Sequence, residues 1–124
     1  MHLIIDGFGG DSAALDSEPV VSALLSELPR VIGMTPISGV RVLRYNAADP
    51  IDSGITGGIF IAESHIAIHT FPANGSAMVD IASCKPFDGP TALASVQAAF
   101  GFAETRHHVI LRLTLPSLAG RVRA

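Results

Sequence analysis

A short run near the middle of the chain, Glu63-Ser64-His65, is followed by a second histidine, His69. In an extended strand, side chains two residues apart share a face, so His65 and His69 point the same way. A serine hydroxyl beside an imidazole is a combination from which activated nucleophiles are built. The Gly-x-Ser-x-Gly elbow of the serine hydrolases does not surround Ser64. Exposed polar positions and a two-histidine metal pair without an obvious third ligand are alternatives, so spacing alone leaves the reaction open.

Length and composition limit the kind of protein that can carry this run. The 124 residues fit one domain, and 48% hydrophobic against 15% charged residues excludes a disordered chain. One lysine and seven scattered arginines, with a net charge of -3, argue against nucleic-acid binding. A single cysteine, Cys84, excludes an internal disulfide and a four-cysteine zinc site.

The hydropathy of the chain bears on its compartment and on its partners. No apolar run approaches the roughly 20 residues of a membrane span, and the first residues do not form a signal peptide. We therefore expect a cytoplasmic protein with no membrane contact. The mean hydropathy of +0.46 is high for a small domain and favours an apolar interface in a homo-oligomer.

Periodicity predicts an α+β domain in the order β-α-β-β-β-β-α-β, with an antiparallel sheet and both helices on one face. A helix capped by Ser17 ends or kinks at Pro29 and Gly33, and a second helix begins after Asp88. A loop is expected over residues 46–54, an Asn-Gly hairpin turn at residues 72–75, and a loose tail from Pro116. The predicted strands cover residues 2–8, 40–45, 55–62, 66–71, 77–84 and 109–113.

The segment from residue 54 to residue 84 carries a more specific pattern as a whole. It runs through Gly54-Ile55-Thr56-Gly57-Gly58, Glu63-Ser64-His65, Ile68-His69-Thr70-Phe71-Pro72, Val79-Asp80 and Ser83-Cys84. This order strongly resembles the short bacterial and archaeal S-adenosylmethionine decarboxylases, which are pyruvoyl enzymes. The likeness is close over residues 54–84 and weaker elsewhere.

This resemblance implies that the chain is a zymogen that cuts itself autocatalytically. Ser64 would attack the carbonyl carbon of Glu63, and β-elimination assisted by His69 would release a β chain of residues 1–63. The α chain, residues 64–124, would then begin with a pyruvoyl group made from Ser64.

The resemblance also assigns supporting roles and the later chemistry. Thr56 stands where the family has a serine that supports processing, and Cys84 stands where the family has its proton donor. The pyruvoyl ketone would form a Schiff base with the substrate amine and accept electrons when carbon dioxide leaves. No external cofactor and no metal are expected.

S-adenosylmethionine is the small-molecule substrate that the resemblance implies, and the decarboxylated product would donate aminopropyl groups in spermidine biosynthesis. Tyr45 or Phe71 would stack on the purine. The loop over residues 46–53 is longer than the family norm and carries Asp49 and Asp52, which would suit a cationic side chain. Ordinary turn positions are the simpler interpretation of both aspartates.

Two alternatives therefore stay open beside the main interpretation. One is a pyruvoyl-dependent ornithine or arginine decarboxylase of the same family, and the other is a non-catalytic paralogue. The family pattern further implies a homo-oligomer of αβ protomers, with two sheets stacked into a sandwich in the dimer.

Overall fold

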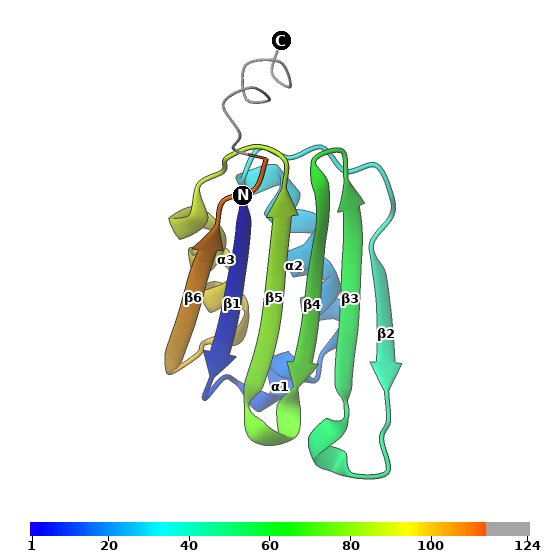
Figure 1. Cartoon of the computed structure of the whole chain (residues 1–124). Coiled ribbons are helices and arrows are strands. Elements are labelled where there is room, and N and C mark those ends of the chain that lie inside the picture. The colour runs from blue at the N-terminus through cyan, green and yellow to red at the C-terminus, as the bar shows by residue number, and fades with distance from the viewer. Residues whose placement is uncertain (114–124) are drawn as a thin grey trace.

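A six-stranded sheet holds the Ser64 and His69 region of the chain. All its strands are antiparallel to their neighbours, in the order β2-β3-β4-β5-β1-β6. This computed structural model describes residues 1–113, so the tail expected from Pro116 lies outside the described residues. Figure 1 shows the long N-terminal strand in the interior of the sheet, between β5 and β6. The strands are β1 (His2–Phe8), β2 (Arg41–Tyr45), β3 (Gly54–Ile61), β4 (Ser64–Phe71), β5 (Ser76–Ser83) and β6 (Glu104–Ile110).

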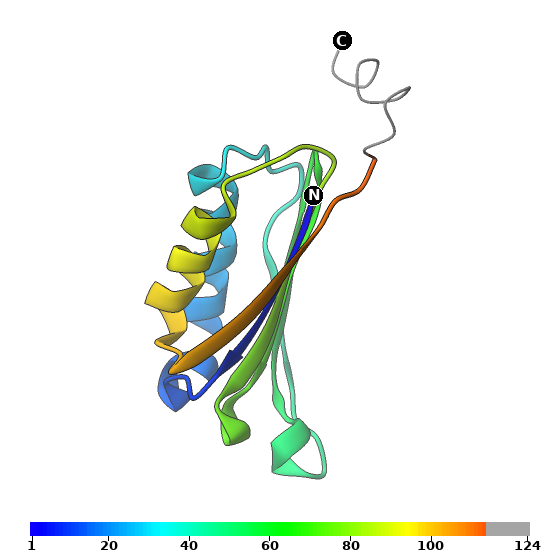
Figure 2. The ribbon, with the colours of Figure 1, turned by 60° about the vertical axis from the view of Figure 1, so that its left-hand side comes forward.

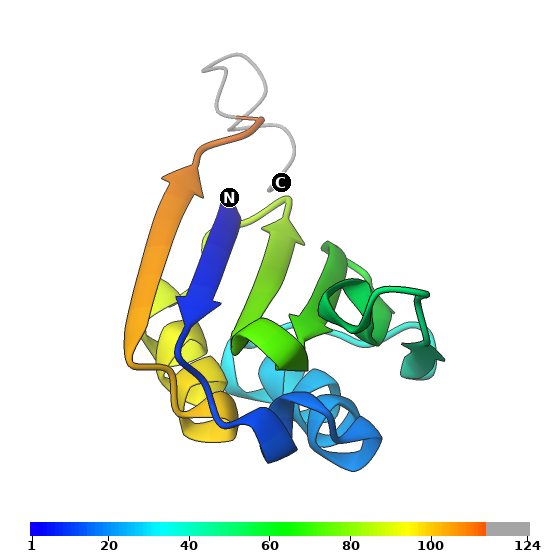
Figure 3. The same ribbon diagram turned by 90° about the horizontal axis from the view of Figure 1, so that it is seen from below.

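The helices cover one face of this sheet, as the sequence predicts. They are α1 (Ser12–Leu15), α2 (Glu18–Val31) and α3 (Gly89–Phe100), and Figure 2 shows α2 and α3 together on one side of the strands. The same one-sided arrangement is plain from below in Figure 3. Apolar side chains of the helices meet alternate residues of the strands, which gives a single core. Among its fully buried members are Leu3, Ile5, Leu24, Leu25, Ile66, Ile68, Val96 and Phe100.

The predicted caps begin both long helices. The Ser17 hydroxyl accepts a hydrogen bond from the N–H of Val20, and the Asp88 carboxylate accepts one from the N–H of Thr91. The helix ends between Pro29 and Gly33, the two residues predicted to end or kink it: α2 continues past Pro29 to Val31, and Gly33 follows with φ 72°. Proline removes only its own N–H, and burial of this face against the sheet outweighs the loss of one helical hydrogen bond. The single-turn helix α1 was not predicted.

The strand boundaries differ from the prediction mainly at the end of the chain. The last strand begins at Glu104 rather than at residue 109, because its polar first half pairs along β1. As an edge strand with both faces largely exposed, it needs no apolar alternation. The hairpin at residues 72–75 is confirmed, with Gly75 in the left-handed conformation at φ 70°.

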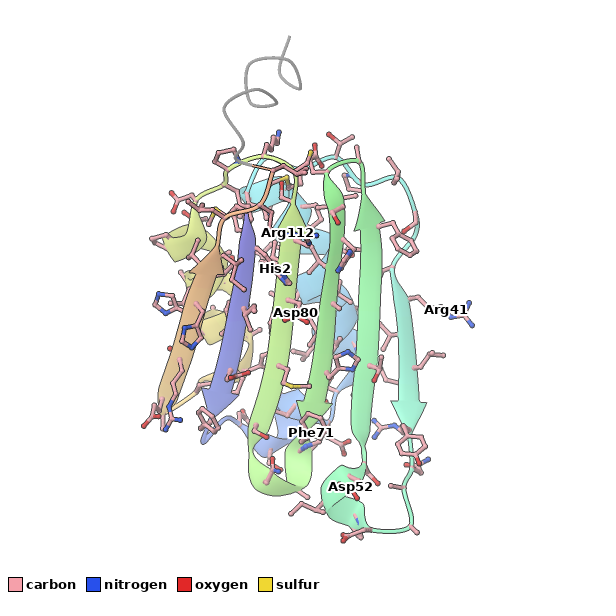
Figure 4. All side chains as sticks on the ribbon, viewed as in Figure 1. His2, Arg41, Asp52, Phe71, Asp80 and Arg112 are labelled. Carbon is pink, nitrogen blue, oxygen red and sulfur yellow. The ribbon has the colours of Figure 1, made fainter. Side chains whose placement is uncertain are left out.

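The second face of the sheet carries no helix. Figure 4 views this open face, with Asp80 over β5, Phe71 over β4 and the helices behind the strands. Several large apolar side chains of this face are exposed, and Phe60 keeps 63% of its surface. The others that lie on it are Phe8, Leu43, Tyr45, Met78 and Ile110.

Candidate active site

Ser64 is the first residue of β4 and follows a tight turn from β3. It pairs with Ile61 on one side and with Ser83 on the other, so the strands fix its backbone from both directions. The side chain itself is exposed, and its Oγ lies 3.2 Å from Nδ1 of His65. The hydroxyl is therefore accessible while its backbone is held in place.

The peptide carbonyl that precedes Ser64 is also held. The carbonyl oxygen of Glu63 accepts a hydrogen bond of 2.9 Å from the N–H of Cys84, just after β5 ends. This contact brings Cys84 next to the Glu63–Ser64 linkage, as the sequence-based roles require. A donor on a carbonyl oxygen favours the negative charge that develops when a nucleophile attacks the carbon.

The side chain of Glu63 anchors the turn to the loop that follows α2. Its Oε1 accepts a 3.0 Å hydrogen bond from the N–H of Thr35, and its Oε2 lies 3.7 Å from Nζ of Lys85. Burial raises the pKa of the Glu63 carboxyl, but the Thr35 hydrogen bond and the Lys85 charge, among other contacts, lower it by more. The net pKa lies below the ordinary glutamate value. Nothing in the sequence signalled Thr35, which is distant along the chain.

His69 and Thr56 form a second pair, which lies on the open face of the sheet. Thr56 is opposite His69 in the β3–β4 register, and its Oγ1 lies 3.1 Å from Nδ1 of the imidazole. A strand advances about 3.3 Å per residue, so Ser64 and His69 are about 17 Å apart along β4. One copy of the chain therefore brings together Glu63, Ser64 and Cys84, but does not bring His69 to them.

A cavity of about 500 Å³ lies toward the His69 end of the sheet. Asp52 and Phe71 line it, together with Asp6, Phe8 and Met78, and Met78 is the direct neighbour of His69 on β5. Figure 4 shows Phe71 and Asp52 near this end of the sheet. Sequence reasoning identified Asp52 and Phe71 as candidate substrate contacts but missed Asp6 and Phe8.

The two remaining substrate candidates, Asp49 and Tyr45, are not among the residues that line this cavity. Asp49 caps the short 3-10 turn Pro50–Asp52, with its Oδ1 accepting the N–H of Ile51 at 3.1 Å, which matches the simpler turn interpretation. Tyr45 ends β2 and is exposed on the open face. Within residues 1–113, no three His, Cys, Asp or Glu side chains are grouped so that they could hold a metal ion. No helix in that part of the chain is long and apolar enough to cross a membrane.

Comparison with known proteins places this geometry in a family. A family model described as S-adenosylmethionine decarboxylase matches residues 1–113. The S-adenosylmethionine decarboxylase proenzyme of Methanococcus maripaludis is 34% identical over 91 residues, which cover 70% of this chain and 70% of the relative. The proenzyme of Caldanaerobacter subterraneus subsp. tengcongensis is 29% identical over 108 residues, covering 84% and 82%.

A solved structure agrees with these sequence matches. The crystal structure of the adenosylmethionine decarboxylase from Aquifex aeolicus superimposes with a TM-score of 0.74 at 26% identity, over 90% of this chain and 88% of that chain. Both the sequence and the fold therefore show that the chain belongs to the S-adenosylmethionine decarboxylase family. The predicted α+β fold class is confirmed by the same structure.

Proposed function

We propose that this chain is a proenzyme that cleaves itself between Glu63 and Ser64 and then decarboxylates S-adenosylmethionine. The observation that carries the proposal is the geometry of one peptide linkage. Its carbonyl oxygen accepts the N–H of Cys84 at 2.9 Å, and the residue that follows it is an exposed serine at the start of a strand. Family membership adds the class of reaction.

The first step of self-cleavage joins two groups that are neighbours along the chain. The Ser64 hydroxyl oxygen bonds to the carbonyl carbon of Glu63, the C–N bond breaks, and an ester replaces the amide. The Cys84 N–H stabilises the negative charge that develops on the carbonyl oxygen during the attack. Removal of the Ser64 Cα proton then breaks the Cβ–Oγ bond and frees the β chain with Glu63 at its end. The dehydroalanine left at position 64 tautomerises to an imine, and water hydrolyses the imine to the pyruvoyl ketone with release of ammonia.

The second step needs a base, and His69 is the base that the resemblance implies. Its distance of about 17 Å from Ser64 within one chain is far beyond hydrogen-bond reach. We therefore propose that His69 and Thr56 act on the Ser64 of a second copy. The open face of the sheet offers the surface for that copy, since Leu43, Phe60 and Met78 are exposed there. Face-to-face stacking would bury these side chains.

The pyruvoyl group supplies the electron sink for decarboxylation. The residues around Ser64 fit such a group, because position 64 is exposed and a substrate amine can reach it. Cys84 lies beside that position and would return a proton to the substrate α-carbon. The product would be decarboxylated S-adenosylmethionine, the aminopropyl donor for spermidine.

A second substrate class is favoured by one observation. The carboxylates of Asp6 and Asp52 line the same cavity as Phe8 and Phe71. Aromatic rings suit a purine, and a carboxylate can bind ribose hydroxyls or face the sulfonium charge. The same carboxylates would also suit the cationic side chain of ornithine or arginine, which keeps a basic amino acid as the alternative substrate.

Intact mass under denaturing conditions tests the self-cleavage. Two fragments divided between residues 63 and 64, the second with a pyruvoyl group in place of its serine, would support the proposal. Ser64→Ala should give a single uncut chain. If the wild-type chain stays whole over days, the proposal is wrong and a non-catalytic paralogue is the better interpretation. Carbon dioxide release from S-adenosylmethionine, ornithine and arginine then separates the two substrate classes.

A further inference from the structure

His65 is the imidazole that contacts the Ser64 hydroxyl in this chain. Its Nδ1 lies 3.2 Å from Ser64 Oγ, whereas His69 of the same chain is about 17 Å away along β4. We propose that His65 takes the proton from the Ser64 hydroxyl in the first step of self-cleavage, which leaves His69 for the elimination step. This inference rests on the proposed self-cleavage and assigns one further catalytic residue to it.

The surroundings of His65 suit a group that must exchange a proton. The ring is exposed on the open face of the sheet, between Phe60 on β3 and Ala82 on β5. Two small residues of the next cross-strand row, Gly58 and Ala67, leave a cavity of about 560 Å³ that His65 also lines. The ring therefore has a large neighbour, Phe60, on one side only, and a small molecule can reach it from the cavity.

Other groups near the scissile linkage are engaged in other contacts. The Glu63 carboxylate accepts the N–H of Thr35 and faces Lys85, and its lowered pKa makes it a weaker base. The N–H of Cys84 is directed to the Glu63 carbonyl oxygen. His65 is thus the base whose geometry already matches the proton that must move.

The proton balance of the step is complete. Neutral His65, with its own proton on Nε2, accepts the Ser64 hydroxyl proton at Nδ1 as the oxygen bonds to the carbonyl carbon of Glu63. The imidazolium then gives that proton to the Ser64 nitrogen as the C–N bond breaks. An ester and a free amine result, and His65 returns to its neutral form. No other reactant is required.

Three variants separate a base from a positioning group. His65→Ala removes the ring, and His65→Asn keeps a hydrogen-bond acceptor near the place of Nδ1 but does not accept a proton near neutral pH. The matched control is His107→Asn on β6, which is exposed and lies on the opposite side of the sheet. The measurement is the half-time of cleavage at 63/64 in freshly translated full-length chain, with and without added imidazole.

A general base contributes about 10²- to 10⁴-fold, so we expect both His65 variants to cleave at least about tenfold more slowly than wild type. Imidazole should accelerate His65→Ala, because the cavity beside the ring admits it, and His107→Asn should cleave at the wild-type rate. A wild-type rate in His65→Ala or His65→Asn, or no effect of imidazole on His65→Ala, would overturn the assignment. In each of those cases wild-type cleavage at 63/64 still supports the proposed function. An uncut wild-type chain would overturn both.

Discussion

Two inactive variants of this protein should restore each other when they are made in the same cell. Ser64→Ala lacks the nucleophile, and His69→Ala lacks the base proposed for elimination. Within one chain these residues are about 17 Å apart, so the proposed shared site takes one residue from each copy. In a mixed dimer, one site has lost both residues. The other combines the Ser64 of the His69→Ala chain with the His69 of the Ser64→Ala chain, and is intact.

The expected amount of cleavage follows from this geometry. Random pairing of equal amounts gives about half mixed dimers, and one of the two chains in each mixed dimer can be cut. About a quarter of all chains should therefore be cleaved, and all of them should carry His69→Ala. Mass spectrometry distinguishes the two variants, so both the fraction and the identity of the cut chain are measurable.

A matched pair provides the control through decarboxylation. Cys84 lies at the same end of the sheet as Ser64, since its N–H contacts the Glu63 carbonyl. Co-expressed Ser64→Ala and Cys84→Ala should therefore not restore activity, because no site of the mixed dimer has both residues. Mixed dimers purified through two different tags that contain no cut chain would refute the shared site. So would a single His69→Ala chain that cleaves at the wild-type rate.

The remaining predictions concern individual contacts. Thr56→Ala should slow cleavage at 63/64 by about fivefold, which corresponds to the loss of one hydrogen bond, and Thr56→Ser should restore the rate when both are followed by intact mass. Gly54→Ala should lower the free energy of unfolding by at least about 2 kcal/mol, because the added Cβ would overlap a backbone oxygen of β4. In the control Gly39→Ala the added Cβ meets open space, so the free energy of unfolding should not fall. The Glu63 carboxyl has a lowered pKa in the folded chain, so it stabilises the fold at pH values above the ordinary glutamate pKa. This stabilisation is lost as the pH falls through the lowered pKa. Glu63→Gln should therefore make the melting temperature depend less on pH in the acid range. Cys84→Ala should reduce kcat far more than it raises KM, and an unchanged kcat would remove Cys84 from proton donation.

Local patterns in the sequence predicted most of the secondary structure. Ser17 and Asp88 cap helices because their side-chain oxygens satisfy backbone N–H groups within the next three residues. Gly75 allows the hairpin because glycine reaches positive φ at no steric cost. The start of β6 was missed because its polar residues are held by pairing with β1, a contact made across most of the chain.

The sequence by itself predicted the α+β class and the face shared by His65 and His69, and its resemblance to a known family is the source of the proposed cleavage between Glu63 and Ser64. These features depend on the types of residues and on their spacing along the chain, and both can be read from the sequence. The tertiary structure decided which of these groups meet. Strand pairing brought Cys84 to the Glu63 carbonyl and Asp52 to a cavity with Asp6. It also kept His69 about 17 Å from Ser64, because β4 is extended between these two residues of the same motif.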